Sequence, residues 1–486
     1  MPSINRLAVR LFRKKPVQAS IQTSLGASGA VPDSGFVFVH NLQGASAALD
    51  EFSDGSEGGP FKAQLRLLED ATADYLNSTT DTCCELTDWN CDKTTAELTI
   101  AAFKCAAAVY KADPKVADGS DSHPILSGLT GIHRKPETDG IRFNELEYVY
   151  PSLDGSSKAI GFWTTESEVI DPTDPHFAAL VVAVRGTERI VDHIVNANSR
   201  PIAAADFLSF HKHQVLAGFA DKLSAHSGFL NSAKALSSLV LRHISRLNQE
   251  GRIKHVIFTG HSAGGGVAAL LYLKFLLEID PLYENLKFSC FTFGAPPILG
   301  ADITEIIKKE PSLERNRGLN LAFVNEFDMV CRVDHSYLRS LIDLYRSVYG
   351  LNPVMKDEIA RKEEKPGVSI MEDTQYVLPP LDFQNTDQEA AVNPTENGLW
   401  PLPKAEYHIF GDLVLLRKEH NTCVKPNERP SKELRALSIR AQDFEKVLYC
   451  GIRTHSRTYY GDRMESVIQG KFNYKDGWDR SRGGNA

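Results

Sequence analysis

The sequence predicts an α/β fold in which a mostly parallel central sheet is flanked by helices. Short apolar runs alternate with helical stretches through much of the 486-residue chain. Such runs are typical of strands that helices bury on both faces. In addition, the segment HVIFTGHSAGGGVAALLYL passes from a β-branched and aromatic strand through a glycine-rich turn into an apolar helix. A sharp strand–turn–helix unit of this kind belongs to the same fold class.

The expected elements follow in order from residue 95. A first helix is predicted over 95–111, where apolar residues recur near helical spacing behind Thr94 or Thr95 as its cap. The remaining apolar runs predict strands at 159–164, 178–184, 255–259, 288–293 and 319–324, and helices at 230–247 and 263–277.

One folded domain over 61–470 is expected, because a decorated α/β enzyme can occupy this length. Residues 1–60 are basic and then rich in Ser and Gly, which predicts a disordered extension. The acidic, proline-punctuated stretch 349–403 is interpreted as an insertion before the C-terminal segment. Residues 471–486 are expected to form a polar tail.

Composition and charge exclude several classes of protein. With 54 Lys and Arg against 62 Asp and Glu, the net charge of −8 predicts no nucleic-acid partner. No apolar run reaches the length of about 18 residues that a bilayer requires, so no integral membrane protein is expected. The eight cysteines form no CxxC pair, which favours neither a zinc module nor a disulfide-dense scaffold. Their redox state stays open.

The first residues of the chain give an expectation for its location in the cell. Its first 15 residues include five Lys and Arg but lack the apolar core of a secretory signal. A cytoplasmic protein is therefore expected. For the basic segment itself, three readings stay open: an organelle-targeting segment, a membrane-surface anchor and a disordered tail.

Ser262 is the predicted nucleophile. It lies in Gly-His-Ser-Ala-Gly, a GxSxG pattern placed between the predicted strand 255–259 and the predicted helix 263–277. This is the context of the nucleophile in the α/β-hydrolase fold, where flanking glycines permit the tight turn. A bare GxSxG arises often by chance, and the alternative is a glycine-rich turn with a solvated serine.

Serine needs a histidine to take its proton and a carboxylate to orient that histidine. Asp328 closes the strand in GLNLAFVNEFDMVCRV and is the predicted acid, with Asp334 as the competitor. His455, late in the chain on a short polar stretch, is the predicted base. The other histidines after the acid are less suitable, because one is too close to it, one opens an apparent strand and one lies in a polar stretch: His335, His408 and His420.

The oxyanion of the tetrahedral intermediate needs preorganised donors. The backbone amide of Ala263, directly after the nucleophile, is the first predicted donor. Thr187, at the end of the strand in ALVVAVRGTE, is the second.

The segment after Thr187 has an apolar and a polar helical face. A lid over the acyl pocket and an ordinary surface helix are the two alternatives for it. His211 and His213 in SFHKHQ have no third ligand at a useful spacing, so we expect solvent-exposed side chains and no metal there.

Taken together, these motifs resemble the fungal lipase-type family, also called class 3 lipases. The matching pieces span roughly 95–462 and are GFWTTE, VVAVRGTERIVDHIVNAN, HSGFLNSAKAL, VIFTGHSAGGG, FTFGAPP, NLAFVNEFDMVCRV, EYHIFGD and THSRTYY. The resemblance implies an α/β-hydrolase with Ser262, Asp328 and His455 at the triad positions. It also implies Thr187 and Ala263 as oxyanion donors and a lid over 188–198, and it assigns His408 to a separate YxH element.

The expected function is hydrolysis of lipid-like carboxylic esters, such as triacylglycerols or other acylglycerols, without a metal or organic cofactor. The expected partners are the lipid or acyl-ester substrate and, peripherally, a membrane or lipid-droplet surface. Two alternatives stay open: a non-catalytic lipase-like signalling or binding protein, and an esterase of water-soluble acyl esters. The long stretch 198–227 and the insertion leave the substrate class open.

Overall fold

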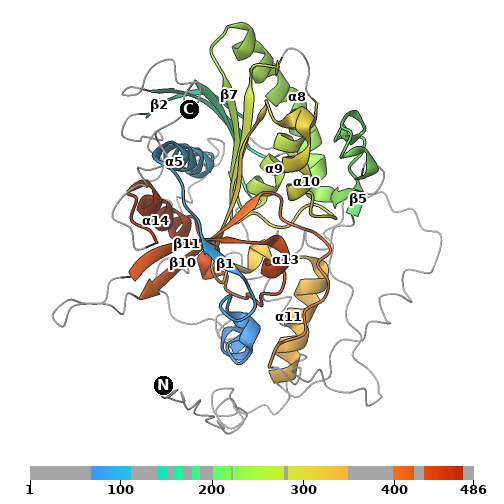
Figure 1. Cartoon of the computed structure of the whole chain (residues 1–486), viewed down its shortest axis with the longest axis vertical. Coiled ribbons are helices and arrows are strands. Elements are labelled where there is room, and N and C mark those ends of the chain that lie inside the picture. The colour runs from blue at the N-terminus through green and yellow to red at the C-terminus, as the bar shows by residue number, and fades with distance from the viewer. Residues whose placement is uncertain are drawn as a thin grey trace, which may run out of the picture.

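A mixed sheet with helices on both faces forms the centre of the protein, as the computed structural model shows (Figure 1). The structure describes residues 67–110, 141–149, 158–167, 178–186, 201–219, 223–278, 283–348, 398–420 and 432–473. Every structural statement below concerns these residues.

The main sheet has nine strands in the described chain, in the order β1-β11-β10-β9-β8-β7-β4-β3-β2. Neighbours from β4 to β10 are parallel, whereas β2 and β3 at one margin and β11 and β1 at the other pair antiparallel. The strands are β1 (Leu86–Asp88), β2 (Ile141–Val149), β3 (Ile160–Ser167), β4 (Ala179–Val184), β7 (His255–His261), β8 (Lys287–Phe293), β9 (Arg317–Asn325), β10 (Asp412–His420) and β11 (Lys432–Ile439). A separate pair consists of β5 (Pro201–Ala203) and β6 (Ser224–His226).

Two helical layers cover the sheet. In Figure 1, α5 and α14 lie on one side of it, and α8 and α9 lie on the other. Successive side chains of the buried strands point to opposite faces of the sheet and so pack against different helical layers. In β4, Val182 packs with α8 and α9, and Val181 packs with α5 and α14. The helices are α5 (Lys93–Ala108), α8 (Ser227–Gln249), α9 (Ala263–Leu277), α10 (Thr304–Lys309), α11 (His335–Val348), α13 (Ala441–Phe444) and α14 (Arg457–Ile468).

The predicted α/β-hydrolase fold is confirmed. Each predicted strand corresponds to one of β3, β4, β7, β8 and β9, and the three predicted helices correspond to α5, α8 and α9. Helix α5 begins earlier than expected, because Asp92 rather than a threonine is its cap and accepts a hydrogen bond from the Thr95 amide at 2.7 Å. The antiparallel strands at the margins and helix α11 were not expected.

Several predictions fall wholly or mostly outside the described residues and remain predictions. These are the extension 1–60, the lid 188–198, the insertion 349–403 and the tail 471–486. The end of the insertion is described, and there Trp400 is buried in the core beside α11. Its indole nitrogen donates to Ser340 Oγ at 2.8 Å.

No described helix is both long and apolar enough to cross a membrane.

Candidate active site

Ser262 lies at a sharp turn between β7 and α9. Its backbone has φ 61° and ψ −136°, a conformation that costs energy in a residue with a side chain and that is typical of functional turns. The turn is too tight for flanking side chains. A Cβ on Gly260 would lie 2.3 Å from the Gly264 carbonyl carbon, and one on Gly264 would lie 2.1 Å from the Val184 oxygen. The glycines of the motif are therefore required by the close contact of strand and helix.

The structure brings Ser262, His455 and Asp328 together from three separate parts of the chain. Ser262 Oγ lies 2.7 Å from His455 Nε2, and His455 Nδ1 lies 2.9 Å from Asp328 Oδ2 and 3.1 Å from Oδ1. The three residues are 2%, 2% and 0% exposed, respectively. With Nδ1 protonated toward the carboxylate, Nε2 is free to accept the serine proton.

Asp328 is held by the turn that follows β9. It precedes the 3-10 helix η6 (Met329–Cys331), and its Oδ1 accepts a hydrogen bond from the Val330 amide at 3.0 Å. Phe327, directly before it, has φ 68°, so the chain bends sharply at this point. As a result of this bend, the second carboxylate oxygen, Oδ2, lies within hydrogen-bond distance of His455 Nδ1.

The competing carboxylate, Asp334, has a different role. It precedes α11 and accepts hydrogen bonds from the amides of Tyr337 and Glu406, both at 2.8 Å. It therefore caps a helix and joins it to a neighbouring loop. Burial raises the pKa of this carboxyl above its ordinary value.

Two of the other candidate histidines are paired with carboxylates away from Ser262 in the described structure. His335 lies 3.8 Å from the Glu406 carboxylate, and His408 pairs with Glu445. His408 precedes β10 instead of opening a strand, since β10 begins at Asp412. The side chain of His420 lies outside the described residues.

The expectation that His213 is solvent-exposed was wrong. The side chain is buried, with Nε2 2.8 Å from the Leu277 carbonyl oxygen and Nδ1 2.9 Å from Ser312 Oγ. Its partners lie about 60 to 100 residues away in the sequence, so local polarity around it gave no sign of burial. The side chain of His211 lies outside the described residues. No group of three or more potential metal ligands occurs in the part of the chain that the structure describes.

Tyr460 is a member of the site that the sequence reasoning did not single out. Its hydroxyl donates to Asp328 Oδ2 at 2.8 Å and accepts from the Asn325 amide at 2.9 Å. Burial and the charge of Asp328 raise the pKa of this phenol well above its ordinary value, so it stays protonated and donates. The only sequence signal was the aromatic pair that follows His455.

A second group of hydrogen bonds links the three loops around Ser262. The Gly186 amide, after β4, donates to the Tyr110 hydroxyl at 3.1 Å, and that hydroxyl lies 3.2 Å from His261 Nδ1. His261 Nε2 in turn lies 2.8 Å from the His455 carbonyl oxygen. With Nε2 protonated toward that carbonyl, Nδ1 accepts from Tyr110. Tyr110 follows α5, 151 residues from His261, and no local pattern marks it.

Of the two predicted oxyanion donors, Ala263 lies within the described residues and Thr187 does not. Ala263 is the first residue of α9, so its amide has no partner within the helix and lies at the positive end of the helix dipole. Gly186 brings the loop after β4 against the nucleophile, since a Cβ there would lie 3.2 Å from the Ser262 Cβ. Thr187 itself lies outside the described residues, and its role stays a prediction.

A family model gives the first comparison with known proteins. The model of class 3 lipases matches residues 181–337, the segment from β4 to the start of α11 that includes Ser262 and Asp328. Two curated proteins of Arabidopsis thaliana, Protein EDS1L and Protein EDS1, are each 24% identical to this chain over 233 residues. The alignments cover 46% of this chain and 36% of each relative, so the chain spans about a third of their length.

Fungal lipases are among the solved structures that are similar to part of the chain. The propeptide complex of Rhizomucor miehei lipase is 16% identical, with 54% of this chain and 69% of that chain covered and a TM-score of 0.34. A nonglycosylated lipase of Yarrowia lipolytica is also 16% identical, with 51% and 77% covered and a TM-score of 0.35. The fold assignment depends on the sheet order and on the turn at Ser262.

Proposed function

We propose that the chain, which matches the model of class 3 lipases over residues 181–337, is a serine hydrolase of lipid-like carboxylic esters. Triacylglycerols or other acylglycerols are the proposed substrates. One observation carries the proposal: Ser262 Oγ lies 2.7 Å from His455 Nε2, whose other ring nitrogen lies 2.9 Å from Asp328. A serine, an imidazole and a carboxylate in this order form a proton-transfer chain that activates the serine.

In the proposed reaction, His455 Nε2 takes the proton from Ser262 Oγ as the oxygen attacks the ester carbonyl carbon. Asp328 keeps the Nδ1 proton in place and stabilises the imidazolium that forms. The Ala263 amide and Thr187 stabilise the oxyanion. His455 then gives its proton to the departing alcohol.

The second half of the proposed reaction releases the acid. His455 takes a proton from a water molecule, whose oxygen attacks the acyl carbon bound to Ser262 Oγ. The bond to Oγ breaks, the serine recovers its proton from His455, and the carboxylic acid leaves. These steps use side chains, backbone amides and water.

Hydrolysis of p-nitrophenyl butyrate by the full chain tests the esterase proposal. We expect Ser262→Ala to lower kcat by about six orders of magnitude, because the nucleophile is lost. Ser232→Ala is the matched control: Ser232 is also buried but donates to a carbonyl of its own helix, so the rate should stay unchanged. Equal rates for wild type and Ser262→Ala would reject the proposed nucleophile, and a folded wild type without turnover would favour a binding protein.

The lipid class needs a separate measurement. Rates with tributyrin are compared below and above its solubility limit. A rate jump as the emulsion forms is expected for an enzyme whose proposed 188–198 lid opens at a lipid surface. A rate that rises and saturates smoothly with tributyrin concentration would favour an esterase of water-soluble acyl esters. The proposal that Ser262 is the nucleophile would not be affected by that result.

A further inference from the structure

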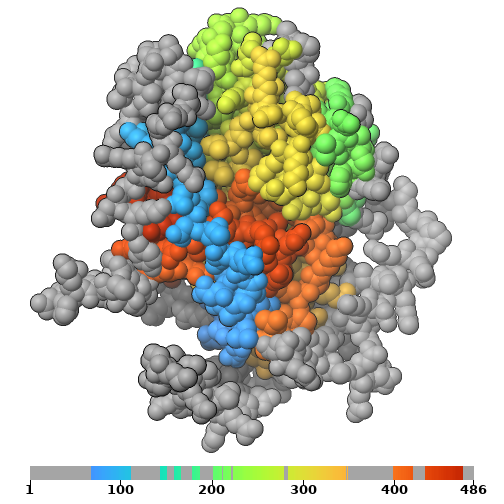
Figure 2. Space-filling view, viewed as in Figure 1, coloured from blue at the N-terminus to red at the C-terminus, as the bar shows by residue number. Residues whose placement is uncertain are grey.

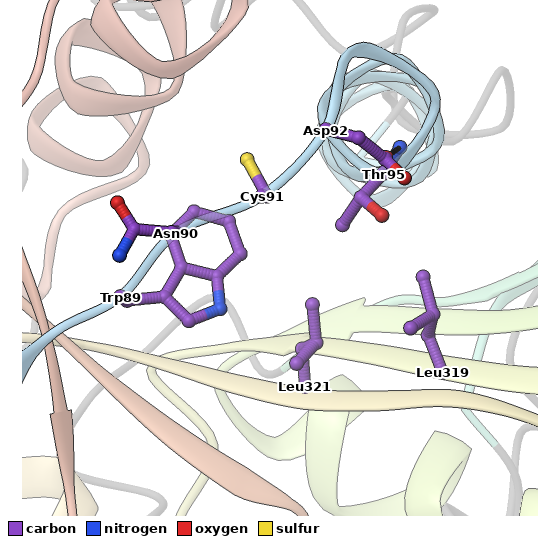
Figure 3. A pocket seen from close by; sticks show the side chains of 7 residues that line it. All are labelled: Trp89, Asn90, Cys91, Asp92, Thr95, Leu319 and Leu321. Carbon is purple, nitrogen blue, oxygen red and sulfur yellow. Dashed lines mark hydrogen bonds between the residues drawn. The ribbon is translucent and has the colours of Figure 1, made fainter. Parts of the chain in front are cut away.

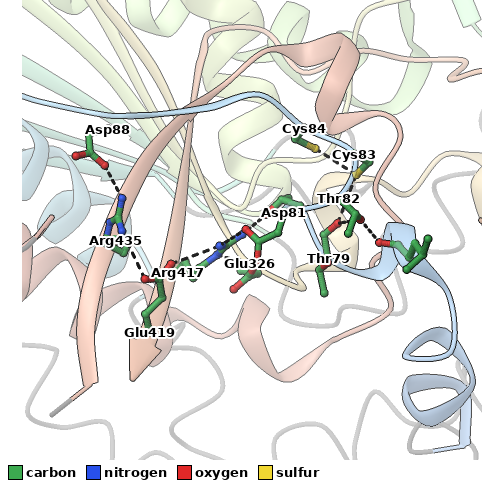
Figure 4. A network of polar contacts seen from close by, with 12 residues as sticks. Thr79, Asp81, Thr82, Cys83, Cys84, Asp88, Glu326, Arg417, Glu419 and Arg435 are labelled. Atoms are coloured by element: carbon green, nitrogen blue, oxygen red, sulfur yellow. Dashed lines mark hydrogen bonds and ion pairs between the residues drawn. The ribbon is translucent and has the colours of Figure 1, made fainter. Parts of the chain in front are cut away.

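Cys83 and Cys84 are neighbours in the chain, and their thiols meet in space. The two Sγ atoms lie 3.3 Å apart in the loop between η1 (Leu76–Ser78) and β1 (Figure 4). Both residues are only half-buried. Four other cysteines are fully buried within the core: Cys105, Cys290, Cys331 and Cys450. The pair therefore combines proximity with access, which the buried thiols lack.

The surroundings of the two thiols differ. The hydrogen bond with Cys84, helped by the positive charge of Lys446, lowers the pKa of the Cys83 thiol below its ordinary value. The same contact and burial raise the pKa of Cys84, whose single S–H is shared between Cys83 Sγ and the Asp443 carbonyl oxygen, each 3.3 Å away. Because the thiolate is the reactive form, Cys83 is suited to attack and Cys84 to follow.

We propose that Cys83 and Cys84 form a reversible modification site, at which small disulfides oxidise the pair to an internal disulfide. The Cys83 thiolate attacks one sulfur of glutathione disulfide, forms a mixed disulfide and expels one glutathione thiolate. Cys84 then loses its proton to water, its sulfur attacks Cys83 Sγ, and the second glutathione thiolate leaves. The pair gives up two protons and two electrons, and two glutathione molecules end as thiols.

Backbone geometry makes this bond easy to reverse. Adjacent Cα atoms lie about 3.8 Å apart across a trans peptide, whereas disulfides normally join Cα atoms about 4.4 to 6.8 Å apart. The ring closed by Cys83 and Cys84 is therefore strained, and strained disulfides are readily reduced. Oxidation also removes the proton that Cys84 donates to Asp443 on α13, so the loop loses this contact with the C-terminal part of the chain. The chemistry of the pair is independent of the proposed esterase activity.

Peptide mass measurement tests the proposal. The reduced full chain is incubated with a large excess of glutathione disulfide, because a strained disulfide forms only under strongly oxidising conditions. It is then alkylated and cleaved after glutamate, which releases a 70–85 peptide holding Cys83 and Cys84 and no other cysteine. We expect this peptide to be unalkylated and lighter by two hydrogens, and dithiothreitol should restore the dithiol. A lasting glutathione adduct on the pair would overturn the proposal.

Two variants separate the roles. Cys84→Ser should trap glutathione on Cys83, and absence of the adduct would overturn the assignment of Cys83 as the attacking thiol. Cys91→Ser is the matched control and should keep the loss of two hydrogens. Cys91 is also half-buried and lines a pocket of about 210 Å³ beside Trp89 and Leu321 (Figure 3), where burial raises the pKa of its thiol to about 12. Modification of Cys91 before the pair would contradict the proposal.

Phenylarsine oxide gives a measurement on the wild-type chain alone, since it must bridge two thiols. We expect it to protect the 70–85 peptide of the wild-type chain from oxidation by glutathione disulfide. Oxidation at an unchanged rate in the presence of the arsenical would show that the thiols do not meet in solution.

Discussion

Two regions of the molecule organise polar groups in opposite ways. At the ends of β7 and β9, side chains from distant segments are buried and hydrogen-bond to one another, as Asp328 does with His455 and Tyr460. Elsewhere, the blue N-terminal part of the described chain lies against the orange and red C-terminal part (Figure 2). Partly exposed ion pairs join Asp81 and Asp88 to β10 and β11 (Figure 4). Arg435, for example, pairs with Asp88 at 2.7 Å. We infer that changes in the first region alter rate and that changes in the second alter stability.

After loss of the nucleophile itself, the largest expected effect comes from Asp328→Asn. The amide keeps the size of the side chain but loses the charge that stabilises the imidazolium, so kcat for p-nitrophenyl butyrate should fall by about ten-thousand-fold. Asp334→Asn is the matched control: its amide oxygen still caps α11, and its amide nitrogen loses the bond from the Glu406 amide, which lowers stability without touching His455. It should leave kcat within about twofold, and an equal loss of activity in both variants would contradict the assignment of the acid.

Arg417→Met should give the largest loss of stability. Arg417 Nε lies 2.9 Å from Glu326, both side chains are about nine-tenths buried, and a second nitrogen lies 2.6 Å from Asp81. Without the arginine, a buried carboxylate loses its partner, which costs about 3 to 5 kcal/mol. Denaturant unfolding measures this cost. Arg435→Met, at a more exposed pair, should cost at most about 1 kcal/mol, and a reversed order would contradict the burial argument.

The pH dependence of the Arg417→Met effect has a definite sign. Burial raises the pKa of Glu326, while Arg417 opposes this rise. In the variant the pKa should rise further, so the folded state binds a proton more tightly than the unfolded state. Stability is then lost as the pH rises above the ordinary glutamate value of about 4.3. The destabilisation should therefore be larger at pH 8 than at pH 5.

Tyr460→Phe should have an intermediate effect on rate. It removes one hydrogen bond to the Asp328 carboxylate, and bonds to charged groups contribute about 1.5 to 3 kcal/mol, or roughly 10- to 100-fold in kcat. Tyr272→Phe is the control, because the Tyr272 hydroxyl is buried without a hydrogen-bond partner in the described structure. An equal fall in kcat for both variants would show that loss of any buried hydroxyl lowers the rate, and it would contradict a specific role for the Tyr460–Asp328 hydrogen bond.

The smallest expected effect concerns His243, which lies outside both regions. It stacks on Phe162 at 4.0 Å, and burial lowers the pKa of its imidazole although Glu147 opposes the shift. The unfolded chain therefore binds the proton more readily, and stability should fall as the pH drops below about 6.5. The Tm between pH 7.5 and 5.5 should change less in His243→Gln than in wild type. If Tm changes equally with pH in His243→Gln and in wild type, His243 is not the source of the pH dependence.

Local patterns explain why part of the site was predictable. Ser262 is marked by glycines that the turn requires, and Asp328 by the end of an apolar strand. His455 was chosen among four histidines by position along the chain and by resemblance to class 3 lipases. The structure joins the three, and their catalytic roles stay a proposal.

The parts of the site and of the fold that were not predicted depend on contacts between residues far apart in the sequence. Tyr110 and Tyr460 orient the site from 151 and 132 residues away from their partners, and no short pattern encodes such pairs. His213 was wrongly expected at the surface for the same reason. The marginal strands β1, β2 and β11 were missed because they lack the continuous apolar runs of the parallel centre.

Labelling with a fluorophosphonate, followed by peptide mapping, tests the central claim most directly. The account predicts one covalent adduct on Ser262 of the wild-type chain, none in Ser262→Ala, and much slower labelling in Asp328→Asn. An adduct that survives Ser262→Ala, or a folded wild-type chain that does not label, would contradict it.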